Sequence, residues 1–174
     1  VSTNGADDVN DGSEEFPYAT IQKAVDQAEA LGNLDELQTI YISPGTYKEN
    51  VYISDDYSEI DLSFVGMGTG PESTIIDGDA NGSVFHLITP NANNYYSYSF
   101  SNLTITNGLA NGGAGINLAR ASLYLNNVHI LDNKFPEDEA TAGAGIQKQY
   151  SGSSQNQVVS IVNCLISGNG GNPA

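Results

Sequence analysis

The sequence has little basic charge, a single cysteine, no tryptophan and no apolar run near the ~18 residues that a membrane span needs. Five Lys and Arg stand against 21 Asp and Glu, which gives a formal charge of −16. This charge repels phosphate backbones and anionic membranes, so we expect no nucleic acid partner and no membrane insertion. Divalent cations and neutral polymers remain open as partners.

The lone cysteine excludes an internal disulfide. Cys164 lies in the apolar run from Val158 to Ile166. A reactive thiol needs an electropositive setting, which this acidic chain hardly offers. We therefore expect Cys164 to be a buried, inert side chain.

One segment has the apolar period of an α-helix. Its apolar residues recur at three- and four-residue steps, so they form one stripe on an amphipathic helix. Thr20 can serve as N-cap and Gly32 as C-terminal stop. The pattern predicts a helix over about residues 20–31, the only one in the chain. The stripe consists of Ile21, Ala24, Val25, Ala28 and Leu31.

After this helix the apolar period changes from 3.6 to 2, which is typical of β-strands. The strands are short, Gly and Asn separate them, and no two-residue hairpin turns join them, which argues against a meander of hairpins. The expected strands include Ile40–Ile42, Val51–Ile53, Ile60–Val65, Thr74–Ile76, Val84–Ile88 and Tyr98–Thr106.

An internal repeat covers the second half of the chain. Three segments align without gaps, and each has two alternating apolar residues, an Asn, and two more alternating apolar residues; they are Tyr98–Ile105, Leu123–Ile130 and Val159–Ile166. Between them, Gly-Ala-Gly-Ile occurs at 113–116 and again at 143–146. Such repeats are typical of units that bury their apolar side chains by stacking on the next unit.

The repeat predicts an all-β fold, a right-handed parallel β-helix (solenoid) of about five coils with an N-terminal capping α-helix. We expect one domain over 1–174, with the helix at about 20–31 and the coils from about 39 to 168. The repeated Asn residues tolerate left-handed backbone and could form a hydrogen-bonded ladder; they are Asn102, Asn127 and Asn163.

Three motifs carry a resemblance to a known family. They are Thr20–Val25 on the helix, the segment Ile42–Glu49 with its Pro-Gly-Thr-Tyr, and the Ile-Ile-Asp-Gly of Ile75–Gly78. Together they resemble the N-terminal part of pectin-lyase-like right-handed parallel β-helix proteins. The later Gly-Ala-Gly-Ile units resemble bacterial surface and autotransporter-like repeat proteins. The resemblance implies an extracellular or cell-surface location, and it specifies no activity, because this fold has many functions.

The last residues of the sequence lie at the position where another repeat unit is expected. Ser167–Ala174 contains no sequence that resembles a C-terminal cap. A bare last unit exposes core and unpaired strand edges. We therefore expect either a fragment truncated at its C-terminus or an open end on which another protein subunit stacks.

The sequence predicts neither catalytic nor cofactor-binding residues. The outward positions of the repeats carry no paired carboxylates and no basic cluster. Uronate lyases of the resembled superfamily use calcium held by acidic residues and an Arg or Lys base. The only arginine, Arg120, has no acidic neighbour in sequence.

Two acidic segments are candidates for calcium. Oxygen-bearing side chains at alternate positions before a Gly are typical of the first half of a calcium loop. In the segment that begins at Asp77, the twelfth position of such a loop is Ile88 instead of Glu. The alternative for both segments is ordinary polar turn. The candidate metal ligands are Asp77, Asp79 and Asn81 in one segment, and Asp7, Asp8 and Asp11 in the other.

Outward aromatic residues are candidates for glycan contact, because an aromatic face is apolar and can stack on a sugar ring. Tyrosine is also simply a good strand residue. The candidates are Tyr41, Tyr52, Tyr124 and His129.

Three functions remain open. The chain could be a structural or adhesive module of a large surface or secreted protein, such as an adhesin, stalk or filament subunit, and the empty outward positions favour this hypothesis. It could instead be the N-terminal part of a carbohydrate-active enzyme such as a polysaccharide lyase, or a carbohydrate-binding module. The enzyme alternative predicts clustered ionisable residues in coils beyond residue 174.

Overall fold

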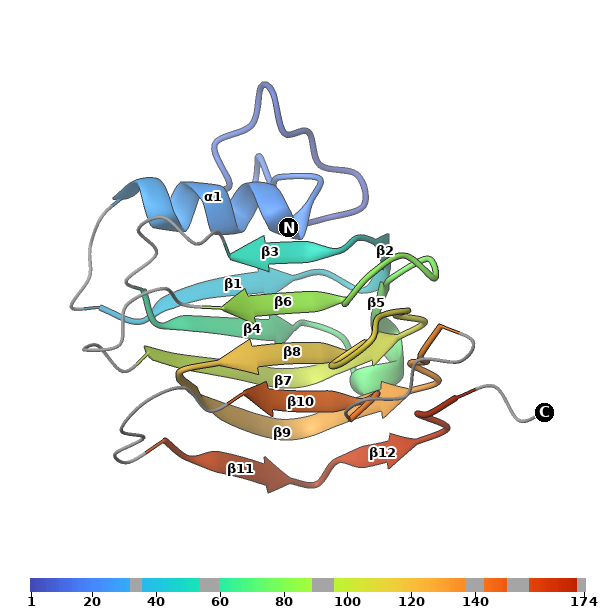
Figure 1. Cartoon of the computed structure of the whole chain (residues 1–174). Coiled ribbons are helices and arrows are strands. Elements are labelled where there is room, and N and C mark those ends of the chain that lie inside the picture. Colours follow the sequence, from blue (N-terminus) through green and yellow to red (C-terminus); the bar gives the residue numbers. More distant parts are fainter. Residues whose placement is uncertain (32–35, 54–59, 89–95, 137–142, 150–156, 172–174) are drawn as a thin grey trace.

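The computed structural model describes residues 1–31, 36–53, 60–88, 96–136, 143–149 and 157–171. One α-helix precedes a series of short parallel strands (Figure 1). The elements are α1 (Ile21–Leu31), β1 (Gln38–Ile42), β2 (Gly45–Lys48), β3 (Val51–Ile53), β4 (Leu62–Gly66), the 3-10 turn η1 (Pro71–Ser73), β5 (Thr74–Asp77), β6 (Phe85–Ile88), β7 (Tyr96–Thr106), β8 (Ile116–Ala119), β9 (Ala121–Leu131), β10 (Ile146–Gln149), β11 (Val159–Val162) and β12 (Leu165–Ser167).

The helix α1 confirms the predicted segment and its N-cap. Thr20 Oγ1 accepts a hydrogen bond from Lys23 N at 3.2 Å, as an N-cap hydroxyl does. Ile21, Val25 and Ala28 are buried, so most of the apolar stripe faces the interior, whereas Leu31 at its end is 71% exposed. No helix among the described residues is long and apolar enough to cross a membrane.

Two carboxylates hold the start of α1. Glu49 accepts hydrogen bonds from the backbone N–H of Ile21 and Gln22, and Asp7 accepts from Ala19 N, Thr20 N and Thr20 Oγ1. Burial raises the pKa of Glu49. At Asp7 burial also acts to raise the pKa, but the hydrogen bonds from Thr20 and Ala19 outweigh it and leave the pKa below its usual value.

The larger sheet has eight strands, all paired in parallel. Its centre is β7, which pairs along one side with both β4 and β5 and along the other with β9. β1 and β2 lie outside β4 and β5, while β11 and β12 lie outside β9. The gapless alignment of the three repeats is confirmed, since Tyr98 pairs with Leu123 and Leu123 with Val159.

The smaller sheet has four parallel strands in the order β10-β8-β6-β3. Ile116 pairs with Ile146, which confirms the second predicted repeat, and Phe85 pairs with Ile116. The two sheets are separate layers, and Figure 1 shows α1 beside β1 and β3 at one end of the molecule and β11 and β12 at the other.

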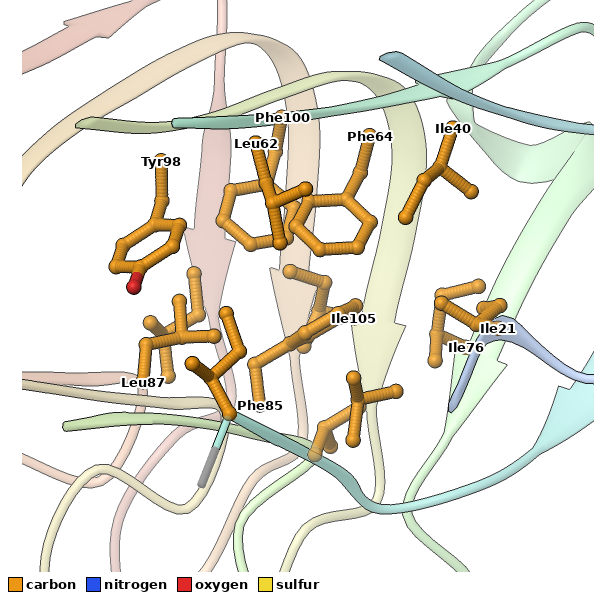
Figure 2. Packing of buried hydrophobic residues seen from close by; sticks show 14 of the residues in the cluster. Ile21, Ile40, Leu62, Phe64, Ile76, Phe85, Leu87, Tyr98, Phe100 and Ile105 are labelled. Atoms are coloured by element: carbon orange, nitrogen blue, oxygen red, sulfur yellow. The ribbon is translucent and has the colours of Figure 1, made fainter. Parts of the chain in front are cut away.

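A single apolar core fills the space between the layers. Figure 2 shows Phe64 and Phe100 side by side, with Phe85 and Leu87 facing them from the other layer. The Phe64 and Phe100 rings stack with their centroids 4.8 Å apart, and Phe85 meets Phe100 edge-on, also at 4.8 Å. Such aromatic pairs add to the free energy gained from burying their area.

The predicted fold class is corrected by this arrangement. The described strands form two parallel sheets, of eight and of four strands, packed as layers with one short helix, rather than the predicted right-handed solenoid of about five coils. The physical reason is that an apolar repeat reports which strands pair and in which register. It does not report how the paired strands are assembled into layers.

The repeated asparagines line up at a bend in the long strands. Asn102, Asn127 and Asn163 have φ angles of 56°, 57° and 53°, as predicted for left-handed backbone. Asn127 Nδ2 donates to Asn102 Oδ1 at 2.9 Å, and Asn102 Nδ2 donates to the carbonyl of Gly66 at 2.8 Å. The side chains of Asn102 and Asn127 thus hydrogen-bond to each other at the point where their strands change direction.

Asn127→Ala should lower the free energy of unfolding by about 1 to 3 kcal/mol. It removes the side-chain hydrogen bond to Asn102, and it places alanine in a left-handed backbone conformation that alanine disfavours. Asn127→Gly should cost less, since glycine tolerates the backbone. Urea unfolding measures both. Equal stability of the two variants would show that the left-handed backbone has no energetic consequence.

Candidate functional site

A shallow groove of about 470 Å³ runs along the outer face of the four-stranded sheet. One residue from each strand contributes to its floor, and these residues are neighbours in register: Tyr52 pairs with His86, His86 with Asn117, and Asn117 with Gln147. The remaining lining residues are Gly82, Ser83, Ala110, Asn111, Gly112 and Gln149.

Tyr52 forms the aromatic end of the groove. Its ring is tilted by 37° to that of His86, with centroids 5.4 Å apart, and the residue is 48% exposed. Gln22 of α1 holds the backbone of Tyr52 on both sides, accepting from its N–H at 2.7 Å and donating to its carbonyl at 2.9 Å. The helix therefore fixes the position of this tyrosine.

Gly82 leaves room for the tyrosine hydroxyl. A Cβ at this position would lie 3.1 Å from Tyr52 Oη, and φ is +75°, where side chains are disfavoured. Asn50 Nδ2 donates to the Ser83 carbonyl at 3.0 Å and ties this turn to the start of β3. The turn thus borders the groove without closing it.

Amide groups form the other half of the groove. Gln149 Nε2 donates to Asn117 Oδ1 at 3.1 Å, and Asn117 Nδ2 lies 3.5 Å from His86 Nδ1, which accepts from it when that nitrogen is unprotonated. Asn117 is almost fully buried. These contacts hold the side chains of neighbouring strands in a fixed row.

The lining contains no Asp, Glu, Lys or Arg. An aromatic face beside convergent amides offers stacking together with hydrogen-bond donors and acceptors. This chemistry suits an uncharged, hydroxyl-rich ligand. The chain's charge of −16 disfavours an anionic ligand.

Of the predicted glycan contacts, the structure places only Tyr52 in this groove. Tyr41, Tyr124 and His129 belong to β1 and β9 of the eight-stranded sheet. Tyr41 and Tyr124 are exposed as predicted, at 58% and 40%. The four candidates therefore do not form one site.

The sequence reasoning missed His86, Asn117 and Gln147. A signal for two of them was present, because Asn117 and Gln147 each follow the isoleucine of a Gly-Ala-Gly-Ile repeat. The pairing of Ile116 with Ile146 places these two amides side by side. His86 lies beside Asn117 because β6 pairs with β8, and no repeated motif in the sequence predicts this pairing.

The predicted calcium ligands near the N-terminus have separate surroundings. Asp7 is bonded to the segment before α1, as described above. Asp11 Oδ1 accepts from Ser13 N at 3.0 Å, and the hydrogen bonds with Ser13 lower its pKa. Asp8 is exposed.

The second predicted calcium segment is bonded internally and to β2. Asp77 Oδ1 accepts from Asp79 N and from Asn107 Nδ2, both at 2.8 Å. Asp79 forms an exposed ion pair with Lys48 at 2.7 Å, and Asn81 is exposed. In the described part of the chain, no three His, Cys, Asp or Glu side chains gather as a metal site would require.

A larger hollow of about 750 Å³ lies between the N-terminal segment, α1 and β1. Tyr18 and Tyr41 line it together with apolar side chains such as Leu31 and the acidic Asp11 and Glu14. It lacks the row of bonded amides found in the groove. We therefore take the groove as the candidate site.

Comparison with protein-family models, curated proteins and solved structures found no match. The resemblance to pectin-lyase-like proteins thus stays a prediction. The geometry of the groove is the basis for the function proposed next.

Proposed function

We propose that this chain is a non-enzymatic, extracellular adhesive module that binds neutral polysaccharide through the groove on the four-stranded sheet. The observation that carries the proposal is the row of Tyr52, His86, Asn117 and Gln147 across four neighbouring strands, in a groove whose lining has no Asp, Glu, Lys or Arg. Parallel strands lie ~4.8 Å apart, so the row extends over roughly three strand spacings. A linear polymer lying across the strands could contact every member.

The tyrosine and the amides have different roles in this proposal. Tyr52, half exposed, offers its ring face to a sugar ring. Gln147 is half-buried and Gln149 is exposed, and their amides can exchange hydrogen bonds with hydroxyl groups. Asn117 acts mainly by holding its neighbours, because its oxygen already accepts from Gln149.

Affinity electrophoresis tests this function. Gels that contain a neutral β-glucan, xylan or galactomannan are compared with gels that contain polygalacturonate or no polymer. We expect at least one neutral polymer to retard the wild-type chain, and polygalacturonate to leave its mobility unchanged. Tyr52→Ala should weaken binding about tenfold, since an aromatic contact is worth about 0.5–1.5 kcal/mol in addition to its buried area.

Tyr124→Ala is the matched control, because it removes an exposed tyrosine from the eight-stranded sheet. Its mobility should follow the wild type in every gel. The proposal is wrong if no neutral polymer retards the chain, or if Tyr52→Ala and Tyr124→Ala behave alike. Release of sugar fragments or unsaturated products from any of these polymers would show that the chain is an enzyme and would contradict a non-enzymatic role.

A further inference from the structure

The last two strands of the eight-stranded sheet form an apolar edge. β11 and β12 pair with β9 on one side, and no described strand pairs with their other side. Six large apolar residues there are each 44–49% exposed: Val158, Val159, Ile161, Val162, Leu165 and Ile166. The register partners of Ile161 and Ile166 one strand inward, Leu125 and Ile130, are buried.

This edge carries no charge in an otherwise highly acidic chain. Residues 149–174 contain no Asp, Glu, Lys, Arg or His, whereas the whole chain has a formal charge of −16. Two copies can therefore approach through this edge without the repulsion that their other surfaces would produce. The unpaired backbone groups of an edge strand also favour pairing with another strand.

The opposite end of the molecule is not a matching partner surface. There α1 covers the core with Ile21, Val25 and Ala28 (Figure 1). Residues 7–31 at that end are dense in Asp and Glu. Head-to-tail stacking of copies would set the apolar edge against a helix and acidic side chains.

We propose that two copies of this chain pair edge to edge through β11 and β12 about a two-fold axis. The left-handed Asn163 bends the chain between the two strands. A two-fold axis through this bend lays β11 of one copy antiparallel to β12 of the other. Ile161 then lies opposite Ile166 of the second copy, and the same surface serves on both sides, as closed dimers require.

Analytical ultracentrifugation tests the pairing. We expect the wild-type chain to sediment with twice the mass of one chain at tens of micromolar. The double variant Ile161→Lys and Ile166→Lys should raise the dimer dissociation constant by about tenfold or more, because it places like charges and buried ammonium groups in the contact. The matched control carries Lys at two exposed positions away from the edge, Val9→Lys and Tyr41→Lys, and should remain dimeric.

Cys164, the only cysteine, reports the position of the axis. It adjoins the bend, so the axis brings the two Cys164 residues together, and a disulfide needs Cα atoms within ~7 Å. Mild oxidation with copper phenanthroline should cross-link the wild type and not the double lysine variant. A dimer that does not cross-link would overturn the placement of the axis at the bend.

Three results would overturn the pairing itself. A wild-type chain that stays monomeric at all concentrations excludes it. Growth beyond the dimer into a concentration-dependent series excludes a closed two-fold contact. Retention of the dimer by the folded double lysine variant places the contact elsewhere. Neutral polysaccharide binding is independent of all three, because the groove lies on the other sheet.

Discussion

Phe100→Ala should lower the free energy of unfolding by about 3 to 5 kcal/mol, the largest stability loss we expect from one apolar truncation in this chain. Phe100 is 1% exposed and joins the two layers, since it stacks on Phe64 of its own sheet and meets Phe85 of the facing sheet. Truncation removes both ring contacts and leaves a cavity between the layers. Chemical unfolding monitored by circular dichroism measures the loss.

Phe16→Ala is the control for this truncation. Phe16 lies in the N-terminal segment and is 50% exposed, so its removal should change stability by no more than about 0.5 kcal/mol. A Phe100→Ala variant as stable as Phe16→Ala would contradict the packing of the two layers against a shared aromatic centre.

Asn133→Asp should be nearly as damaging at neutral pH, with an expected loss of about 3 kcal/mol or more. The Asn133 side chain is fully buried. Its Nδ2 donates to the carbonyls of Ile105 and Leu131 and to Asn169 Oδ1, while its Oδ1 accepts from Gly108 N. A carboxylate there would face three acceptors that have lost their donor.

The loss from Asn133→Asp should depend on pH in a defined direction. Burial among acceptors raises the pKa of the new carboxyl in the folded state, so ionisation favours the unfolded state. The difference in unfolding free energy from wild type should therefore grow as the pH rises from 4 to 7. Asn126→Asp, at an exposed position on β9, should show little change at either pH. A pH-independent difference would contradict the acceptor-rich surroundings of Asn133.

The pairing of strands was predictable because register leaves a direct trace in sequence. Aligning the three Asn-centred repeats pairs Tyr98 with Leu123 and Val159, and the structure has these pairs. The helix was predictable for the same reason, since Ile21, Val25 and Ala28 have helical spacing and are buried. The second asparagine contact, between Asn133 and Asn169, has the 36-residue separation of Asn127 and Asn163 and could have been found by extending the same alignment.

The layer arrangement and the strand β2 were not predictable in this way. The expected strands did not include β2, although Gly45–Lys48 pairs with β5. Alternation of apolar residues indicates which strands pair, but it does not determine how the paired strands are assembled into sheets. The predicted solenoid was wrong for this reason. Cys164 was predicted to be buried, but it is only partly so, because no described strand covers β12.

The groove was only partly predictable. Tyr52 was a candidate because it alternates outward between Val51 and Ile53. Tyr41 and Tyr124 alternate outward in the same way, but they lie on the eight-stranded sheet, outside the groove. Which outward residues share a face depends on sheet membership, and alternation within one strand contains no information on that.

The uneven placement of charge gives the molecule a strong electric dipole. Carboxylates concentrate beside α1, while the region of β11 and β12 is neutral, and these lie at opposite ends (Figure 1). On an amine-coated support at low ionic strength, the molecules would settle with the helix toward the support, because attraction to the surface is strongest there. An immobilised layer would thus present its last two strands outward in a uniform orientation.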